Sequence, residues 1–89
     1  MSFRIDFFNR GQPVVILRVS GRIQAENVDT LRGALGRQNG RVVIDLEEVA
    51  LVDREAVAFL ALSEIDGVEL RNCPAYIREW VDREKRSER

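Results

Sequence analysis

The segment RVVIDL, residues 41–46, limits the fold of this chain more than any other segment. It holds three consecutive β-branched residues, Val42, Val43 and Ile44, followed by one charge and a leucine. A strand in which apolar and polar residues do not alternate is buried on both faces, and such strands are typical of the middle of a parallel sheet. We therefore expect residues 41–46 to form a central strand.

Helical patterns lie on both sides of this strand. Before it, within residues 22–40, an apolar residue recurs every three or four positions, at Ala25, Val28, Leu31 and Leu35. After it, residues 53–65 predict a strongly apolar helix, and a third helix is expected to begin at Pro74. The charges from about residue 82 onward predict that this last helix frays into a solvated C-terminal tail.

Three further segments predict strands: residues 3–7, residues 14–19 and residues 68–70. The resulting order is β-β-α-β-α-β-α, which is the alternation of an α/β protein. We expect one domain over residues 1–89, with a mixed four-stranded sheet that is mostly parallel. The N-terminal strand is expected to be an antiparallel edge strand, and the helices are expected to pack on the sheet.

The composition excludes several classes of partner. The chain has 14 basic and 15 acidic residues and a net charge of −1, so it lacks the basic excess expected of a nucleic-acid-binding protein. No apolar run approaches the length of a membrane span, and no signal-peptide pattern follows Met1, so we expect no membrane insertion. The single cysteine, Cys73, cannot form an internal disulfide, which favours a reducing, cytoplasmic location.

The sequence also lacks most catalytic chemistry. It contains no histidine, which removes the commonest general base and most zinc sites. Its six glycines do not follow the spacing of a phosphate-binding loop. We therefore expect no enzymatic activity, no cofactor and no metal. As an alternative, Asp45, Asp53 and Glu55 would act together in an enzyme or a small-ligand site.

Three segments together resemble the STAS domain, the module named for sulfate transporters and anti-sigma factor antagonists. They are LRVSGRI before the first helix, RVVIDLEEVALVDREAV in the centre, and VELRNCP before the last helix. The resemblance covers about residues 3–84 and implies the mixed sheet described above. It also implies a regulatory domain that binds a protein partner, such as an anti-sigma-factor-like kinase.

The resemblance fails at the regulatory residue. In the bacterial antagonists, a Ser that follows an Asp at the start of the second helix is phosphorylated, and this switches partner binding. Here Asp53 matches the family Asp, but Arg54 stands at the Ser position and Glu55 at the next. Arg54 cannot accept a phosphate, so this switch is lost. The remaining hydroxyls near this edge are Ser20, Thr30 and Ser63, and any of them could be a displaced phosphorylation site. Of the three, Ser63 is the candidate that we select.

Two interpretations of the helix start remain open. Asp53, Arg54 and Glu55 are either a simple helix cap or a contact surface of fixed charge that binds a partner constitutively. We expect partner binding by these three residues, by the helix face that carries Ala58, Phe59 and Leu62, and by the loop after the second strand, Ser20, Gly21 and Arg22. On this helix Phe59 and Leu62 form a partly exposed apolar patch, unless Phe59 tucks under a neighbouring loop.

The predicted function is thus that of a non-catalytic module that binds a regulator. Three alternatives remain: an antagonist switched by phosphorylation of a displaced Ser or Thr, a small accessory subunit of a lipid or anion transporter of the ABC type, and a homodimer with a structural role.

Overall fold

The computed structural model describes residues 3–9, 12–38 and 40–88 and has the predicted order of elements. The strands lie side by side in the order β1 (Phe3–Phe8), β2 (Val14–Ile23), β3 (Arg41–Val52) and β4 (Glu69–Arg71). The helices are α1 (Ala25–Gly36), α2 (Arg54–Ile65) and α3 (Ala75–Glu88). β1 is antiparallel to β2, and the other two strand pairs are parallel. The predicted mixed sheet with an antiparallel edge strand is therefore confirmed.

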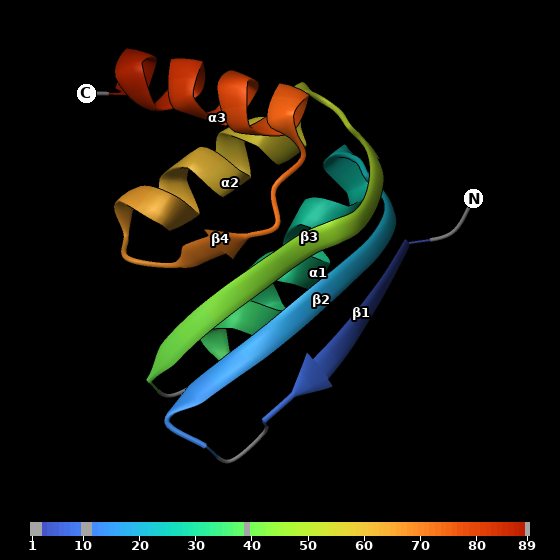
Figure 1. Cartoon of the computed structure of the whole chain (residues 1–89), viewed down its shortest axis with the longest axis vertical. Helices are drawn as coiled ribbons and strands as arrows, with labels where there is room; N and C mark the ends of the chain where they lie inside the picture. The colour runs from blue at the N-terminus through green and yellow to red at the C-terminus, as the bar shows by residue number, and fades with distance from the viewer. Residues whose placement is uncertain (1–2, 10–11, 39, 89) are drawn as a thin grey trace.

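The helices and the sheet form layers around one core. In Figure 1, α1 crosses behind β2 and β3, while α3 packs along α2 at the end of the sheet near β4. Along β2, residues Val15, Leu17 and Val19 point into the core, because alternate side chains of a strand face the same side. Within the described part of the chain, no helix is long and apolar enough to cross a membrane.

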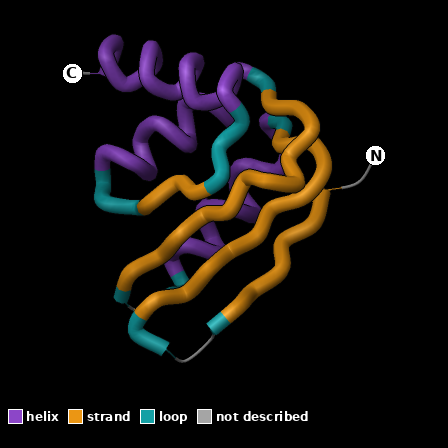
Figure 2. Tube along the Cα trace, in the orientation of Figure 1, coloured by secondary structure: helices purple, strands orange, loops and turns teal. Residues whose placement is uncertain are grey.

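The two central strands are longer than the sequence predicts. The apolar patterns end at Val19 and Leu46, whereas β2 and β3 continue side by side to Ile23 and Val52, as the curved strands in Figure 2 show. Their pairing passes through two register shifts. Each shift interrupts the period of two in the sequence without ending the strand, and for this reason the pattern hides the extension.

This extension corrects one predicted contact segment. Ser20, Gly21 and Arg22 lie within β2 and not in a loop after it. Gly21 has a φ of 89°, a backbone conformation that favours glycine, and it stands at one of the register shifts. Ser20 is half-buried and Gly21 is buried, so only Arg22 is exposed.

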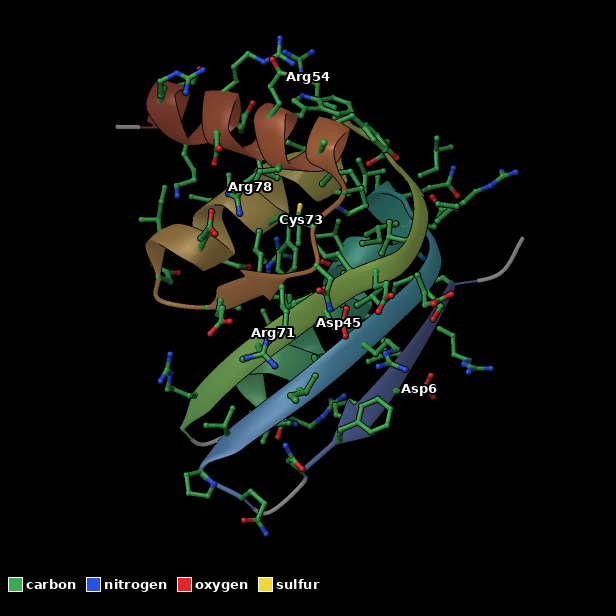
Figure 3. The ribbon with its side chains drawn as sticks, in the orientation of Figure 1. Asp6, Asp45, Arg54, Arg71, Cys73 and Arg78 are labelled. Carbon is green, nitrogen blue, oxygen red and sulfur yellow. The ribbon has the colours of Figure 1, made fainter. Side chains whose placement is uncertain are left out.

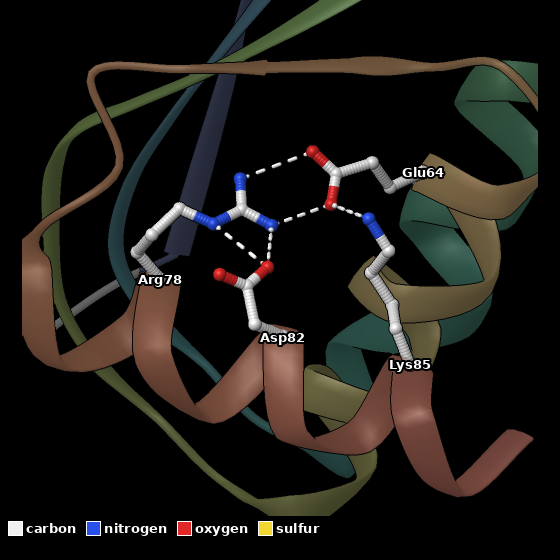
Figure 4. A network of polar contacts seen from close by, with 4 residues as sticks. All are labelled: Glu64, Arg78, Asp82 and Lys85. Atoms are coloured by element: carbon white, nitrogen blue, oxygen red, sulfur yellow. Dashed lines mark hydrogen bonds and ion pairs between the residues drawn. The ribbon is translucent and has the colours of Figure 1, made fainter.

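The last helix also differs from the prediction. α3 continues to Glu88, well past the residue at which the charges predict a frayed tail. Two of those charged residues, Asp82 and Lys85, are held in a network with Glu64 of α2 and Arg78 of α3 (Figure 4). Contacts with a neighbouring helix keep this segment helical, and a single-sequence pattern cannot show such contacts.

Candidate functional site

The first turn of α2 is anchored by Asp53, which also reaches α1. Its Oδ1 atom accepts a hydrogen bond from the backbone N–H of Ala56 at 3.0 Å, the bond of a helix N-cap. Its Oδ2 atom accepts another from the backbone N–H of Ala25, in the first turn of α1, at 2.8 Å. One carboxylate therefore satisfies free N–H groups of two helices. The predicted N-cap is confirmed, and the bond to α1 is a second role.

The sheet topology creates this double cap. The backbone N–H of Asp53 donates to the carbonyl oxygen of Ile23 at 3.1 Å, so the carboxyl ends of β2 and β3 lie together. The helices that follow these two strands consequently begin beside each other, at the carboxyl ends of the strands. Asp53 and Ala25 are 28 residues apart in the chain, and a local sequence pattern carries no signal for a bond of that range.

Two fixed charges follow Asp53 at the tip of α2. Arg54 and Glu55 are both exposed, and Figure 3 shows Arg54 at the outer edge of the molecule. Neither side chain forms an ion pair or a hydrogen bond with the described residues. Glu55 lies favourably near the positive end of the helix dipole, whereas Arg54 lies unfavourably there. Nothing in the stability of the helix therefore requires Arg54.

The exposed side of α2 continues from these charges along the helix. Its members, which we call the α2 outer face, are Arg54, Glu55, Ala58, Leu62 and Ile65. Apart from the neighbours Arg54 and Glu55, these residues are spaced by three or four positions, so they share one side of the helix. The Leu62 side chain is 47% exposed, as the sequence predicts for an apolar patch.

Phe59 does not belong to this exposed face. It is only 7% exposed and packs in the main core cluster, so the predicted exposure of Phe59 was wrong. The guanidinium carbon of Arg32, on α1, lies 5.8 Å from the centre of its ring. The arrangement is a cation–π contact, and it places Phe59 beneath α1. The side of α2 that carries Phe59 is therefore covered by another helix and not by a loop.

A groove separates α1 from α2 above Phe59. It has a volume of about 420 Å³ and opens to solvent. Its lining residues come from both helices and from the turn between α2 and β4: Arg32, Leu35, Gly36, Phe59, Leu62, Ser63, Asp66 and Val68. Leu62 belongs both to this groove and to the α2 outer face, so the two surfaces are continuous.

Leu51 and Tyr76 are exposed apolar residues that the sequence reasoning missed. The Tyr76 hydroxyl donates to the carbonyl oxygen of Ala50 at 3.1 Å, which holds the start of α3 against the end of β3. Leu51 precedes Asp53 by two residues in the chain. The sequence signal for this exposure is Leu51 itself, an apolar residue close to the N-cap Asp53.

Ser63, the candidate for a displaced phosphorylation site, is nearly buried. Ser63 is 6% exposed, and its carbonyl oxygen accepts the backbone N–H of Val68 at 3.0 Å in the turn that leads to β4. A kinase must reach the hydroxyl oxygen of its substrate, so the prediction of Ser63 as a phosphorylation candidate is not supported by its burial.

Asp45 and Asp53 serve separate structural purposes. Asp45 is buried in β3, where its Oδ1 atom accepts hydrogen bonds from the Glu47 N–H and the Asn72 amide, and Arg18 lies 3.6 Å from its Oδ2 atom. Figure 3 shows Asp45 on the side of the sheet turned away from α1. The carboxylates of the proposed catalytic set are thus not gathered around one pocket.

Within the described residues, no three acidic or cysteine side chains come together as metal ligands. Cys73 is half-buried, and burial raises the pKa of its thiol, so little of it is the reactive thiolate at neutral pH. Cys73 packs against the main core cluster, which agrees with a space-filling role.

Charged side chains join α2 to α3 behind the outer face (Figure 4). Arg78 donates to both carboxylate oxygens of Glu64 and to Asp82 at 2.7 Å, and Lys85 reaches Glu64 at 3.0 Å. Burial alone would raise the pKa of Glu64, but the hydrogen bonds from Arg78 and Lys85 lower it below its ordinary value. The hydrogen bond from Arg78 likewise lowers the pKa of Asp82.

We expect Arg78→Leu to destabilise the protein by about 1–2 kcal/mol at pH 7, because it removes charge-assisted hydrogen bonds from partly exposed carboxylates. Because the pKa of Glu64 is lowered in the folded protein, its carboxylate contributes fully to the free energy of unfolding above its ordinary pKa of 4.5. That contribution is lost as the pH falls through the lowered pKa. The difference between wild type and variant should therefore shrink in acid. Urea unfolding at several pH values measures it, with Arg83→Leu on α3 as the control. A difference that is independent of pH would contradict this account.

Comparison of the sequence with protein-family models and with curated proteins finds no match. Comparison with solved structures does find similar folds. An antisigma-factor antagonist, a STAS domain from Rhodobacter sphaeroides, has a TM-score of 0.58 and 24% identity, over 78% of this chain and 83% of that one. The anti-sigma factor antagonist SpoIIAA, in its unphosphorylated form, has a TM-score of 0.53 and 14% identity, over 92% and 96% of the two chains.

A third structure, that of Mglu, has a TM-score of 0.61 and 22% identity, over 80% of this chain but only 19% of Mglu. The two antagonists match over most of their own length. The predicted resemblance is confirmed at the level of structure: this chain has the STAS fold.

Proposed function

We propose that this chain is a non-catalytic regulatory domain that binds another protein with the α2 outer face. The observation that carries the proposal is the pair of unpaired, exposed charges, Arg54 and Glu55, continuous with exposed Leu62 on the same side of the helix. An apolar centre beside charges is the usual composition of a transient protein interface. The partner we propose is a protein of the anti-sigma-factor class, because two proteins of this fold are antagonists of such factors.

Binding through this face is proposed to be constitutive. Position 54 carries a guanidinium in place of a hydroxyl, and Ser63 is buried, so neither offers a phosphate acceptor at the surface. The charge at the tip of α2 then stays constant, and the amount of this protein or the state of its partner sets the extent of binding. Intact-mass measurement after incubation with the partner kinase and ATP should show no added phosphate.

We expect Leu62→Glu to weaken partner binding by about tenfold or more, because it places a charge at the apolar centre of the proposed contact. The free energy of unfolding should change by no more than about 0.5 kcal/mol, since Leu62 is exposed. The measurement is capture of partners on the immobilised chain from extract of its own cells, followed by titration calorimetry with the purified partner.

The matched control compares two exposed arginines on different helices. Arg54→Glu reverses a charge on the α2 outer face, whereas Arg83→Glu makes the same change on α3. Only the first should weaken binding. Equal affinity of Leu62→Glu, Arg54→Glu and the wild type for an anti-sigma-factor-like partner would reject this surface, and turnover of a small molecule by the chain would reject the non-catalytic role.

A further inference from the structure

The outer edge of β1 lies at the opposite side of the sheet from α2 (Figure 1). β1 is the terminal strand of the sheet and pairs only with β2 among the described strands. In an antiparallel strand, alternate residues direct their backbone N–H and C=O groups away from the neighbouring strand. Such an edge can accept another strand, and proteins commonly discourage this with charged side chains.

The two faces of β1 differ in chemistry. Phe3, Ile5 and Phe7 face the core, where they pack against its clusters but remain only half-buried because β1 is the last strand. Arg4 and Asp6 point to the other face, where their side chains form an ion pair at 3.0 Å. The edge thus presents an apolar row on one face and two opposite charges on the other.

These charges are complementary to a second copy of the same strand. If two β1 strands pair antiparallel with Ile5 opposite Ile5, Arg4 of each chain stands opposite Asp6 of the partner subunit. Phe3 then stands opposite Phe7 of the partner subunit, so the apolar rows also meet. A shift of two residues would instead set Arg4 against Arg4 or Asp6 against Asp6, and like charges directly opposite each other are destabilising.

The remainder of the sheet continues the same alternation of charge. On the face turned away from α1, the register places Asp6 beside Arg18, Arg18 beside Asp45, and Asp45 beside Arg71. Figure 3 shows Asp6, Asp45 and Arg71 on this face. In the proposed pairing, Arg4 of the partner subunit would stand next to Asp6 and place a positive charge beside that negative one. The row would then run across the junction without two like charges as neighbours.

We propose that this chain self-associates through β1 into a symmetric dimer with a continuous eight-stranded sheet, centred on Ile5. The interface is isologous, since the same strand is used by both copies. A single short strand pair buries little surface. The buried area falls in the range of weak, transient interfaces, below about 1,200 Å². The dimer should therefore form in a concentration-dependent way.

The test uses two charge variants, each alone and then mixed. Arg4→Asp gives β1 two negative charges and Asp6→Arg gives it two positive charges, so each variant opposes like charges at both symmetric positions. Each change should weaken self-association by about tenfold or more. An equimolar mixture should restore a dimer that contains one copy of each variant. Sedimentation equilibrium and native mass spectrometry distinguish the three species.

Two further measurements keep the test decisive. Asp6→Arg places an arginine beside Arg18, so urea unfolding checks its fold; if it fails to fold, Arg4→Asp alone is compared with the control Arg83→Asp on α3. In the wild type, amide exchange in β1 should slow as the concentration rises. A wild type that stays monomeric at high concentration, or an Arg4→Asp variant that dimerises as well as Arg83→Asp, would overturn the proposal.

Discussion

Replacing Phe59 with alanine should lower the free energy of unfolding by about 3 kcal/mol, toward the lower end of the range for buried aromatic residues. Phe59 is 7% exposed and belongs to the main core cluster, so its loss leaves a cavity between α1 and α2. The neighbouring groove allows partial relaxation, which keeps the cost below the upper end of that range. The change also removes the contact with Arg32.

Chemical unfolding of Phe59→Ala and of Leu62→Ala, on the same helix, measures this effect directly. Leu62→Ala should change stability by only about 0.5 kcal/mol, because its side chain is exposed. The comparison also separates the two roles that the sequence allows for Phe59. If Phe59→Ala kept full stability and lost partner binding, Phe59 would be a contact residue and the assignment to the core would be wrong.

Replacing Asp53 with alanine should cost about 2–3 kcal/mol, more than the roughly 1 kcal/mol of an ordinary N-cap. The reason is that both carboxylate oxygens accept backbone hydrogen bonds, one from Ala56 and one from Ala25. Without them, N–H groups at the starts of two helices lose their partners. We therefore expect a local effect on α1 as well as on α2.

Asp53→Asn tests the double cap. Its single amide oxygen can keep the bond to Ala56, while the amide nitrogen cannot accept the N–H of Ala25. We therefore expect Asp53→Asn to lower the free energy of unfolding by about half as much as Asp53→Ala. Urea unfolding measures the total, and amide exchange at the start of α1 reports the second bond. Unchanged exchange of Ala25 in Asp53→Ala would show that the cap serves α2 alone.

The central strand shows how far the sequence pattern extends. Val42, Val43 and Ile44 predicted burial on both faces, and all three are buried in the structure. This inference worked because burial of consecutive apolar residues is a property of the segment itself. The predicted ends of the strands were wrong, because the register shifts between β2 and β3 depend on the pairing of two segments.

The candidate site divides in the same way. The cap at Asp53 and the exposure of Leu62 followed from the residues near them, and both were predicted. The burial of Phe59 was decided by α1, the burial of Ser63 by the turn into β4, and the order in α3 by the ion pairs to Glu64. In each of these cases the neighbour comes from elsewhere in the chain.

The sequence by itself determined the order of the strands and helices, the absence of histidine chemistry and the permanent charge at position 54, because each depends only on which residues follow one another. The tertiary structure alone decided which side of α2 meets solvent, which helix starts share Asp53 and which strand is left at the edge. These features depend on distances between segments that are remote in the chain, and residue spacing carries no information about such distances.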